Sequence, residues 1–186
     1  NIILSRVEGP EAVTQYNIAY KYFNVLNMVF VIVLTPFWSA FTDAYVKKDY
    51  NWMSGIVKKL EFLWLLCIPI LILMVLCSNF FYQWWVGNSV SISFSLSICM
   101  AVFMFFYTSA NLYMILINGT SMVCLQLIIN VCFAIISLPC ICLFCRLWGV
   151  QGALLIPTVT LAVLTLIGKI QIMKIVNNRA TGIWQR

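Results

Sequence analysis

Histidine is absent from this sequence, and acidic residues are scarce, with five among 186 residues. We expect these acids in loops or at helix ends: Glu8, Glu11, Asp43, Asp49 and Glu61. A membrane-embedded hydrolase or transferase needs a general base or metal ligands inside its site, and the sequence supplies no such group there. We therefore predict that the chain is not an enzyme and binds no metal or cofactor. Proton- and sodium-coupled transporters commonly carry a mid-membrane carboxylate, so any coupling-ion site is expected outside this stretch.

Polar composition of the kind that a soluble domain needs is also missing. Charged residues make up 9% of the chain and hydrophobic residues 63%, and the mean hydropathy is +1.00. This composition excludes a soluble globular domain and predicts an all-α polytopic membrane protein. The chain begins with Asn1 rather than Met, within the apolar phrase NIIL, so we expect a piece of a longer protein.

Two features that could suggest other functions have simpler explanations. The net charge of +6 is divided among short loops and the tail, as in the flanks of membrane helices, so we predict no nucleic-acid binding. The eight cysteines lie in apolar segments without histidine or carboxylate partners. We interpret them as small buried hydrophobic residues.

Hydrophobic runs predict five complete transmembrane helices and the end of a sixth. Residues 1–5 read as the end of a preceding span, residues 45–59 as a basic loop and residues 177–186 as a basic cytoplasmic tail. Each complete span is long enough for a hydrocarbon core of about 30 Å. The five spans are 13–44, 62–85, 91–117, 122–147 and 153–176. Interior prolines predict kinks at Pro36, Pro69, Pro139 and Pro157.

Positive charge differs between the two sides of these spans. The side of the basic loop and the tail carries Lys47, Lys48, Lys58, Lys59, Lys169, Lys174, Arg179 and Arg186. The other side carries only Arg6 and Arg146. The positive-inside rule therefore predicts a cytoplasmic C-terminus.

The first complete span, residues 13–44, has a polar seam. At 3.6 residues per turn, one side of this helix collects Asn17, Lys21, Asn24, Met28, Thr35, Ser39 and Thr42, with Tyr20 and Asn27 beside them. Uncompensated polar groups cost free energy in hydrocarbon, so the seam should face other helices or a watery cavity. Whether its groups only bond to neighbouring helices or line a cavity is open at this point.

Lys21 has two interpretations. A lysine at the bilayer centre costs about 2.5 to 3.5 kcal/mol on insertion scales. Because the helix is longer than the bilayer needs, Lys21 could instead extend to the outer interface with little cost. The alternative is a cation that faces a cavity, since Asn17, Tyr20 and Asn24 surround it on the same face.

Several short phrases, in this order, resemble a known family. They are YNIAYKY (16–22) after a GPE turn, PFWSAFTDAY (36–45), the WVG turn (85–87), the NG turn at Asn118, LWGVQGA (147–153) and NNRATGIW (177–184). Together they are similar to the C-terminal half of bacterial polysaccharide flippases, members of the multidrug/oligosaccharidyl-lipid/polysaccharide (MOP) exporter superfamily.

The resemblance implies one lobe of a two-lobe transporter in the bacterial inner membrane. Its substrate would be an undecaprenyl-pyrophosphate-linked sugar repeat unit, moved from the cytoplasmic to the periplasmic leaflet by alternating access. The implied partners are this substrate, the missing N-terminal lobe of the same chain and membrane lipid. Lys21 would be a cavity cation, and Asn17, Tyr20, Asn24, Thr35 and Ser39 would line the cavity. The alternatives are a multidrug exporter of the same superfamily and a non-transporting membrane scaffold of a glycan-assembly complex.

Overall fold

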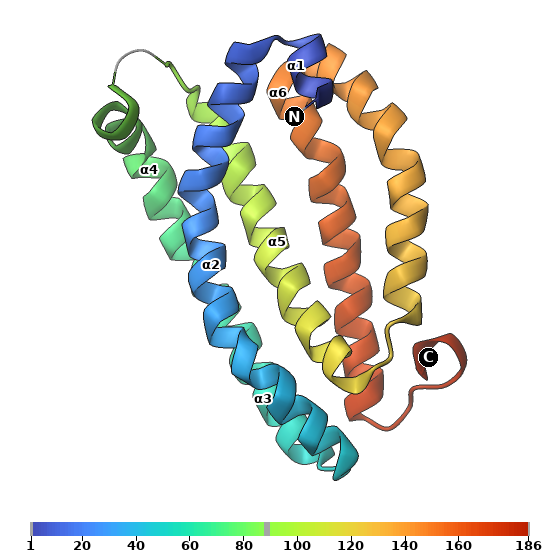
Figure 1. Cartoon of the computed structure of the whole chain (residues 1–186). Coiled ribbons are helices and arrows are strands. Elements are labelled where there is room, and N and C mark those ends of the chain that lie inside the picture. The colour runs from blue at the N-terminus through green and yellow to red at the C-terminus, as the bar shows by residue number, and fades with distance from the viewer. Residues whose placement is uncertain (1, 88–89, 186) are drawn as a thin grey trace.

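The computed structural model describes residues 2–87 and 90–185, and the described residues form helices and no strand (Figure 1). The expected roles of Asn1, of residues 88 and 89 in the turn after the second span, and of Arg186 in the tail lie outside the described residues. The helices are α1 (Ile2–Val7), α2 (Pro10–Val46), α3 (Tyr50–Leu65), α4 (Cys67–Val86), α5 (Phe94–Thr120), α6 (Cys124–Val176) and the short 3₁₀ helix η2 (Gly182–Gln185).

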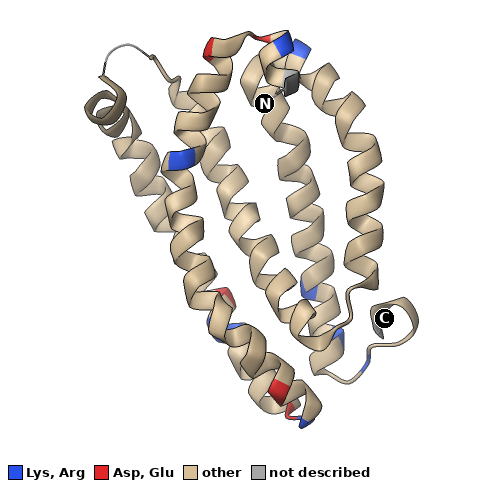
Figure 2. Cartoon of the chain, viewed as in Figure 1, with Lys and Arg blue, Asp and Glu red and all other residues tan. Residues whose placement is uncertain are grey.

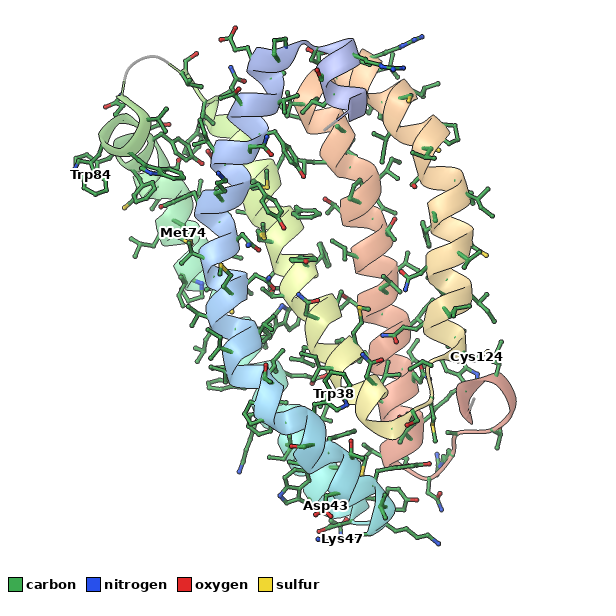
Figure 3. All side chains as sticks on the ribbon, in the orientation of Figure 1. Trp38, Asp43, Lys47, Met74, Trp84 and Cys124 are labelled. Atoms are coloured by element: carbon green, nitrogen blue, oxygen red, sulfur yellow. The ribbon has the colours of Figure 1, made fainter. Side chains whose placement is uncertain are left out.

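The described chain is an all-α polytopic membrane protein, which confirms the predicted fold class. Four helical stretches are long and apolar enough to cross a membrane: Pro10–Val46, Tyr50–Val86, Phe94–Thr120 and Cys124–Val176. Most of the charged residues lie toward the two ends of the bundle (Figure 2). At the far end of α4, Trp84 points away from the other helices, as a tryptophan at a membrane interface does (Figure 3).

The fourth stretch, α6, is folded back on itself. Its 53 residues would extend about 80 Å if straight, far more than a bilayer requires. Trp148 and Gly149 leave the helical conformation, and the halves before and after them run side by side in opposite directions (Figure 1). The expected break between the spans 122–147 and 153–176 is thus shortened to two residues, and these two spans fall in the two halves of α6.

Two glycines make this reversal possible. Gly149 has φ +61° and ψ −144°, a conformation that essentially only glycine adopts. A Cβ atom on Gly152 would overlap the carbonyl oxygen of Phe144 in the preceding half. Neither Pro139 nor Pro157 lies at the break, because both are inside helical segments of α6.

The expected basic loop over residues 45–59 is wrong. Only Lys47, Lys48 and Asp49 separate α2 from α3. Asp49 begins α3 as its N-cap, accepting a hydrogen bond from the Trp52 backbone N–H at 3.0 Å. Lysines 58 and 59 therefore lie on a helix.

The expected turn at Asn118 and Gly119 is also wrong. Helix α5 continues to Thr120, and the chain turns at Ser121, which has φ +62°. A Cβ on Gly119 would lie 3.1 Å from the Trp38 carbonyl oxygen of α2. Gly119 therefore allows two helices to approach closely, and Figure 3 shows Trp38 on the lower half of α2.

Helix α5 is the central element and is more enclosed than the other three spanning stretches. It packs between α2 and the second half of α6, with α4 beside it. Aromatic side chains link the helices at three places. Trp64 Nε1 of α3 donates to the Phe105 carbonyl of α5 at 3.0 Å, the Tyr22 hydroxyl of α2 donates to the Met74 carbonyl of α4 at 3.1 Å, and the Tyr82 and Ser97 hydroxyls are 3.2 Å apart.

The interpretation of all eight cysteines as buried residues is wrong for most of them. All are free, but only Cys67 and Cys145 are buried, whereas Cys77 and Cys132 are exposed on outer faces of their helices. Because the medium at these outer faces is hydrocarbon, burial inside the protein is not required to shelter a thiol from water.

A pair of glycine substitutions tests the close contact between α5 and α6. A Cβ on Gly168 would lie 2.8 Å from Tyr113 Cβ, whereas nothing lies within 4 Å of the corresponding position at Gly55 on α3. We expect Gly168→Ala to destabilise the protein by about 1–3 kcal/mol, and Gly55→Ala to leave its stability equal or higher. Thermal unfolding of the purified chain in detergent measures both. Equal stability of Gly168→Ala and the parent would contradict the tight contact.

Candidate functional site

The predicted seam residues fall on α2 in two separate groups. Asn17, Tyr20 and Asn24 are half-buried at the edge that faces α5, and Lys21 beside them is exposed. Thr35 and Ser39 are exposed lower on the same helix, about 21 and 27 Å along the axis from Lys21 at 1.5 Å per residue. The structure therefore brings four of the six predicted residues together.

An amide network joins the upper group to α5. Asn111 Nδ2 of α5 donates to Asn27 Oδ1 at 2.9 Å, and Asn27 Nδ2 donates to Asn24 Oδ1 at 3.2 Å. Asn27 is buried, so these bonds satisfy an amide that would otherwise be costly inside the membrane. This part of the seam acts in helix packing, one of the two possibilities left open by the sequence.

Tyrosine side chains continue this polar edge above the amides. The Tyr20 phenol interacts with that of Tyr107 on α5. The rings of Tyr16 and Tyr20 are stacked with their centroids 6.1 Å apart. Tyr107 and Asn111 of α5 were not predicted from the sequence, because no pattern on α5 indicates which of its faces meets α2.

Lys21 is the cation of this group and has no partner within the protein. Among the described residues, none forms a hydrogen bond or an ion pair with its ammonium group. It lies about 17 Å along α2 from Pro10, in a helix of 37 residues that is about 55 Å long. Because this length exceeds the hydrocarbon core of about 30 Å, both interpretations from the sequence stand: a side chain that reaches the outer interface, and a cation that faces a water-filled surface or an anionic ligand.

The lower group satisfies its hydrogen bonds within α2. The Thr35 hydroxyl donates to the Val31 carbonyl at 2.8 Å, and the Ser39 hydroxyl donates to the Pro36 carbonyl at 3.2 Å. Such bonds let hydroxyl groups sit in a spanning helix without any outside partner. Both residues line an open hollow beside Trp38 that is separate from Lys21.

The four predicted kink positions have different surroundings. Pro36, Pro139 and Pro157 lie inside α2 and α6. Pro69 lies near the start of α4, three residues after Leu66, where α3 and α4 separate. This separation is consistent with the missing N–H of proline, which leaves the carbonyl four residues earlier without its helical donor.

A charged cluster that sequence analysis missed joins three helices. The Tyr113 hydroxyl of α5 donates to Glu61 Oε1 of α3 at 2.6 Å, and Lys169 Nζ of α6 is 3.2 Å from the same oxygen. Tyr113 and Lys169 are each seven residues from the ends of their helices, so the cluster lies about 10 Å inside the bundle.

The placement of Glu61 corrects the expectation that every acid lies in a loop or at a helix end. Its side chain is 22% exposed, against 47% for that of Lys169. Each residue has apolar neighbours, in LEFLW for Glu61 and in LIGKIQI for Lys169. Opposite charges inside apolar segments commonly pair, so this was the available signal.

Comparisons of the chain with protein-family models, with curated proteins and with solved structures found no match. Within the described ranges, no group of three or more Cys, Asp or Glu residues is arranged to hold a metal ion. The side chains described above comprise one unpaired cation, amides and phenols beside it, and an ion pair near the opposite end of the bundle.

A double-mutant cycle tests the Glu61 and Lys169 pair. We expect Glu61→Gln and Lys169→Met to show a coupling of about 0.5–2 kcal/mol in the free energy of unfolding, because the carboxylate is partly shielded and bonded to Tyr113. The exposed pair of Asp43 and Lys47, whose atoms are 2.7 Å apart, is the matched control. Its coupling should be at most about 0.5 kcal/mol. Equal couplings for the two pairs would contradict a structural role for the Glu61 cluster.

Proposed function

We propose that this chain is one lobe of a transporter that moves an anionic, lipid-linked saccharide across the bacterial inner membrane. The observation that carries the proposal is Lys21, a cation inside a spanning helix without a counter-ion among the described residues. Its ammonium group would bind the pyrophosphate that links sugar to lipid. The resemblance of the sequence to polysaccharide flippases of the MOP superfamily supports the same function.

The distribution of charge supports a cytoplasmic C-terminus. The end of α2, the start of α3 and the end of α6 lie toward the same end of the bundle (Figures 1 and 2). That end holds the basic residues Lys47, Lys48, Lys58, Lys59, Lys169, Lys174 and Arg179. In the proposed orientation Lys21 lies in the periplasmic half of α2, and the Glu61 cluster lies near the cytoplasmic boundary.

The Glu61 carboxylate bears on one alternative function, that of a multidrug exporter of the same superfamily. Such exporters would favour carboxylates and aromatic rings for cationic drugs. Glu61, however, is compensated by Lys169 and Tyr113, whereas Lys21 is the group left without a partner. The unpaired charge of this site is therefore positive, which favours an anionic substrate.

Substitutions of Lys21 in the whole protein test the proposal. We expect Lys21→Ala to reduce transport about tenfold or more, since a hydrogen bond to a charged group contributes about 1.5–3 kcal/mol. Lipid-linked sugar intermediates should then accumulate on the cytoplasmic side at unchanged protein level. Lys21→Arg should retain more transport than Lys21→Glu, because the sign of the charge is what matters. Exposed Lys59→Ala is the control.

Normal surface glycan in the Lys21→Ala strain would contradict the cation role. Normal glycan in Lys21→Ala, Asn17→Ala and Asn24→Ala strains alike would favour the scaffold alternative instead.

A further inference from the structure

A second hollow, lined by apolar side chains with a few polar ones, lies between α5 and the two halves of α6. It has a volume of about 360 Å³, within the range of small-molecule sites in proteins. Its lining includes Phe103, Tyr107, Asn130, Phe133, Ser137 and Thr160. None of these residues belongs to the polar seam of α2.

The lining combines aromatic rings with polar groups. The rings of Phe103 and Tyr107 are stacked, with their centroids 5.7 Å apart and an interplanar angle of 12°. Phe103 is buried and Tyr107 is half-buried, so Tyr107 is the more accessible ring. The hydroxyls of Ser137 and Thr160 donate to carbonyls of their own helices, which leaves their lone pairs free to accept. The hollow therefore offers an aromatic ring and hydroxyl acceptors side by side.

Asn130 is the group of this hollow that lacks a partner. No described residue forms a hydrogen bond with its amide, although an amide in a spanning helix has two donors and one acceptor to satisfy. A ligand rich in hydroxyl or acetamido groups would supply the missing partners.

Tyr107 connects the hollow to the residues near Lys21. Tyr107 lines the hollow and also interacts with Tyr20 of α2. Tyr20 is the chain neighbour of Lys21. A ligand with an anionic group at Lys21 could therefore place an adjoining group in the hollow.

We infer that this hollow binds the sugar ring next to the pyrophosphate of a lipid-linked saccharide. This inference rests on the proposed function and assigns a subsite to it. A sugar ring has an apolar face of C–H groups and a rim of hydroxyls, which match the Tyr107 ring and the Asn130 amide. Tyr107 would contact both the sugar and, through Tyr20, the part of the site that holds the anion.

Binding of two probe lipids to the purified whole chain tests the subsite. The probes are a polyprenyl diphosphate carrying one N-acetylhexosamine and the same polyprenyl diphosphate without sugar. We expect Asn130→Ala and Tyr107→Ala each to weaken binding of the sugar-bearing lipid about fivefold or more. Binding of the sugarless lipid should be unchanged. Tyr107→Phe, which keeps the ring, should lose less than Tyr107→Ala.

Val102→Ala is the matched control, because Val102 lies on α5 in an apolar groove with α4 and away from the hollow. It should leave the affinity for both lipids unchanged. Thermal unfolding of each variant identifies any general loss of structure. Equal weakening of the two lipids by Asn130→Ala and Tyr107→Ala, or no weakening of either, would overturn the subsite.

A Lys21→Ala arm separates failure of the subsite from failure of the proposed function. If Lys21→Ala weakens both lipids while Asn130→Ala and Tyr107→Ala weaken neither, the subsite is wrong and the proposed function stands. If Asn130→Ala weakens only the sugar-bearing lipid and Lys21→Ala weakens neither, the subsite stands and the cation role is wrong. If the parent chain binds neither lipid, both are wrong.

Discussion

Hydrocarbon offers no hydrogen-bonding partner, so each polar side chain in a spanning helix must find one inside the protein. This constraint explains how the helices are joined. Asn27 of α2 bonds to Asn111 of α5, and Tyr113 of α5 bonds to Glu61 of α3. Near the C-terminus, Gln171 Nε2 donates to the Met122 carbonyl at 2.8 Å. Among the described residues, Lys21 and Asn130 are without such a partner and lie next to open space, whereas the unpartnered polar atoms of Ser109, Gln126 and Thr165 are buried.

Helix α5 separates two different surfaces. Toward α4 it borders a groove of about 400 Å³ lined only by apolar side chains, among them Ala101 and Phe105. Toward α6 it borders the hollow with Tyr107 and Asn130. These α5 residues lie on different sides of one helix. The groove matches the hydrocarbon of a bilayer, whereas the hollow adds hydroxyl and amide groups to an apolar lining, so the two sides of the central helix differ in chemistry.

The fold class could be predicted from the sequence because hydropathy averages over whole segments, and the reversal at Gly149 falls in the expected turn. The helix ends near residues 45–59 and Asn118 could not be predicted in this way. They depend on individual contacts, the hydrogen bond of the Asp49 cap and the close approach of Gly119 to α2, which hydropathy does not reveal. The Glu61 cluster was missed because Tyr113 is 52 residues away in sequence. Hydropathy places residues along a helix. The partners of Lys21, Asn27 and Glu61 depend instead on which helices are neighbours in the folded chain.

The central claim is that the α2 edge with Lys21 and Asn24 faces water, whereas the side with Val29 faces lipid. Single cysteines at these positions, in a chain whose eight native cysteines are replaced, test it most directly. A charged, membrane-impermeant thiol reagent reacts with the ionised thiol, which forms only where water reaches it. The account predicts rapid labelling of Asn24→Cys and little labelling of Val29→Cys in intact membranes. Equal labelling of both, or faster labelling of Val29→Cys, would contradict it.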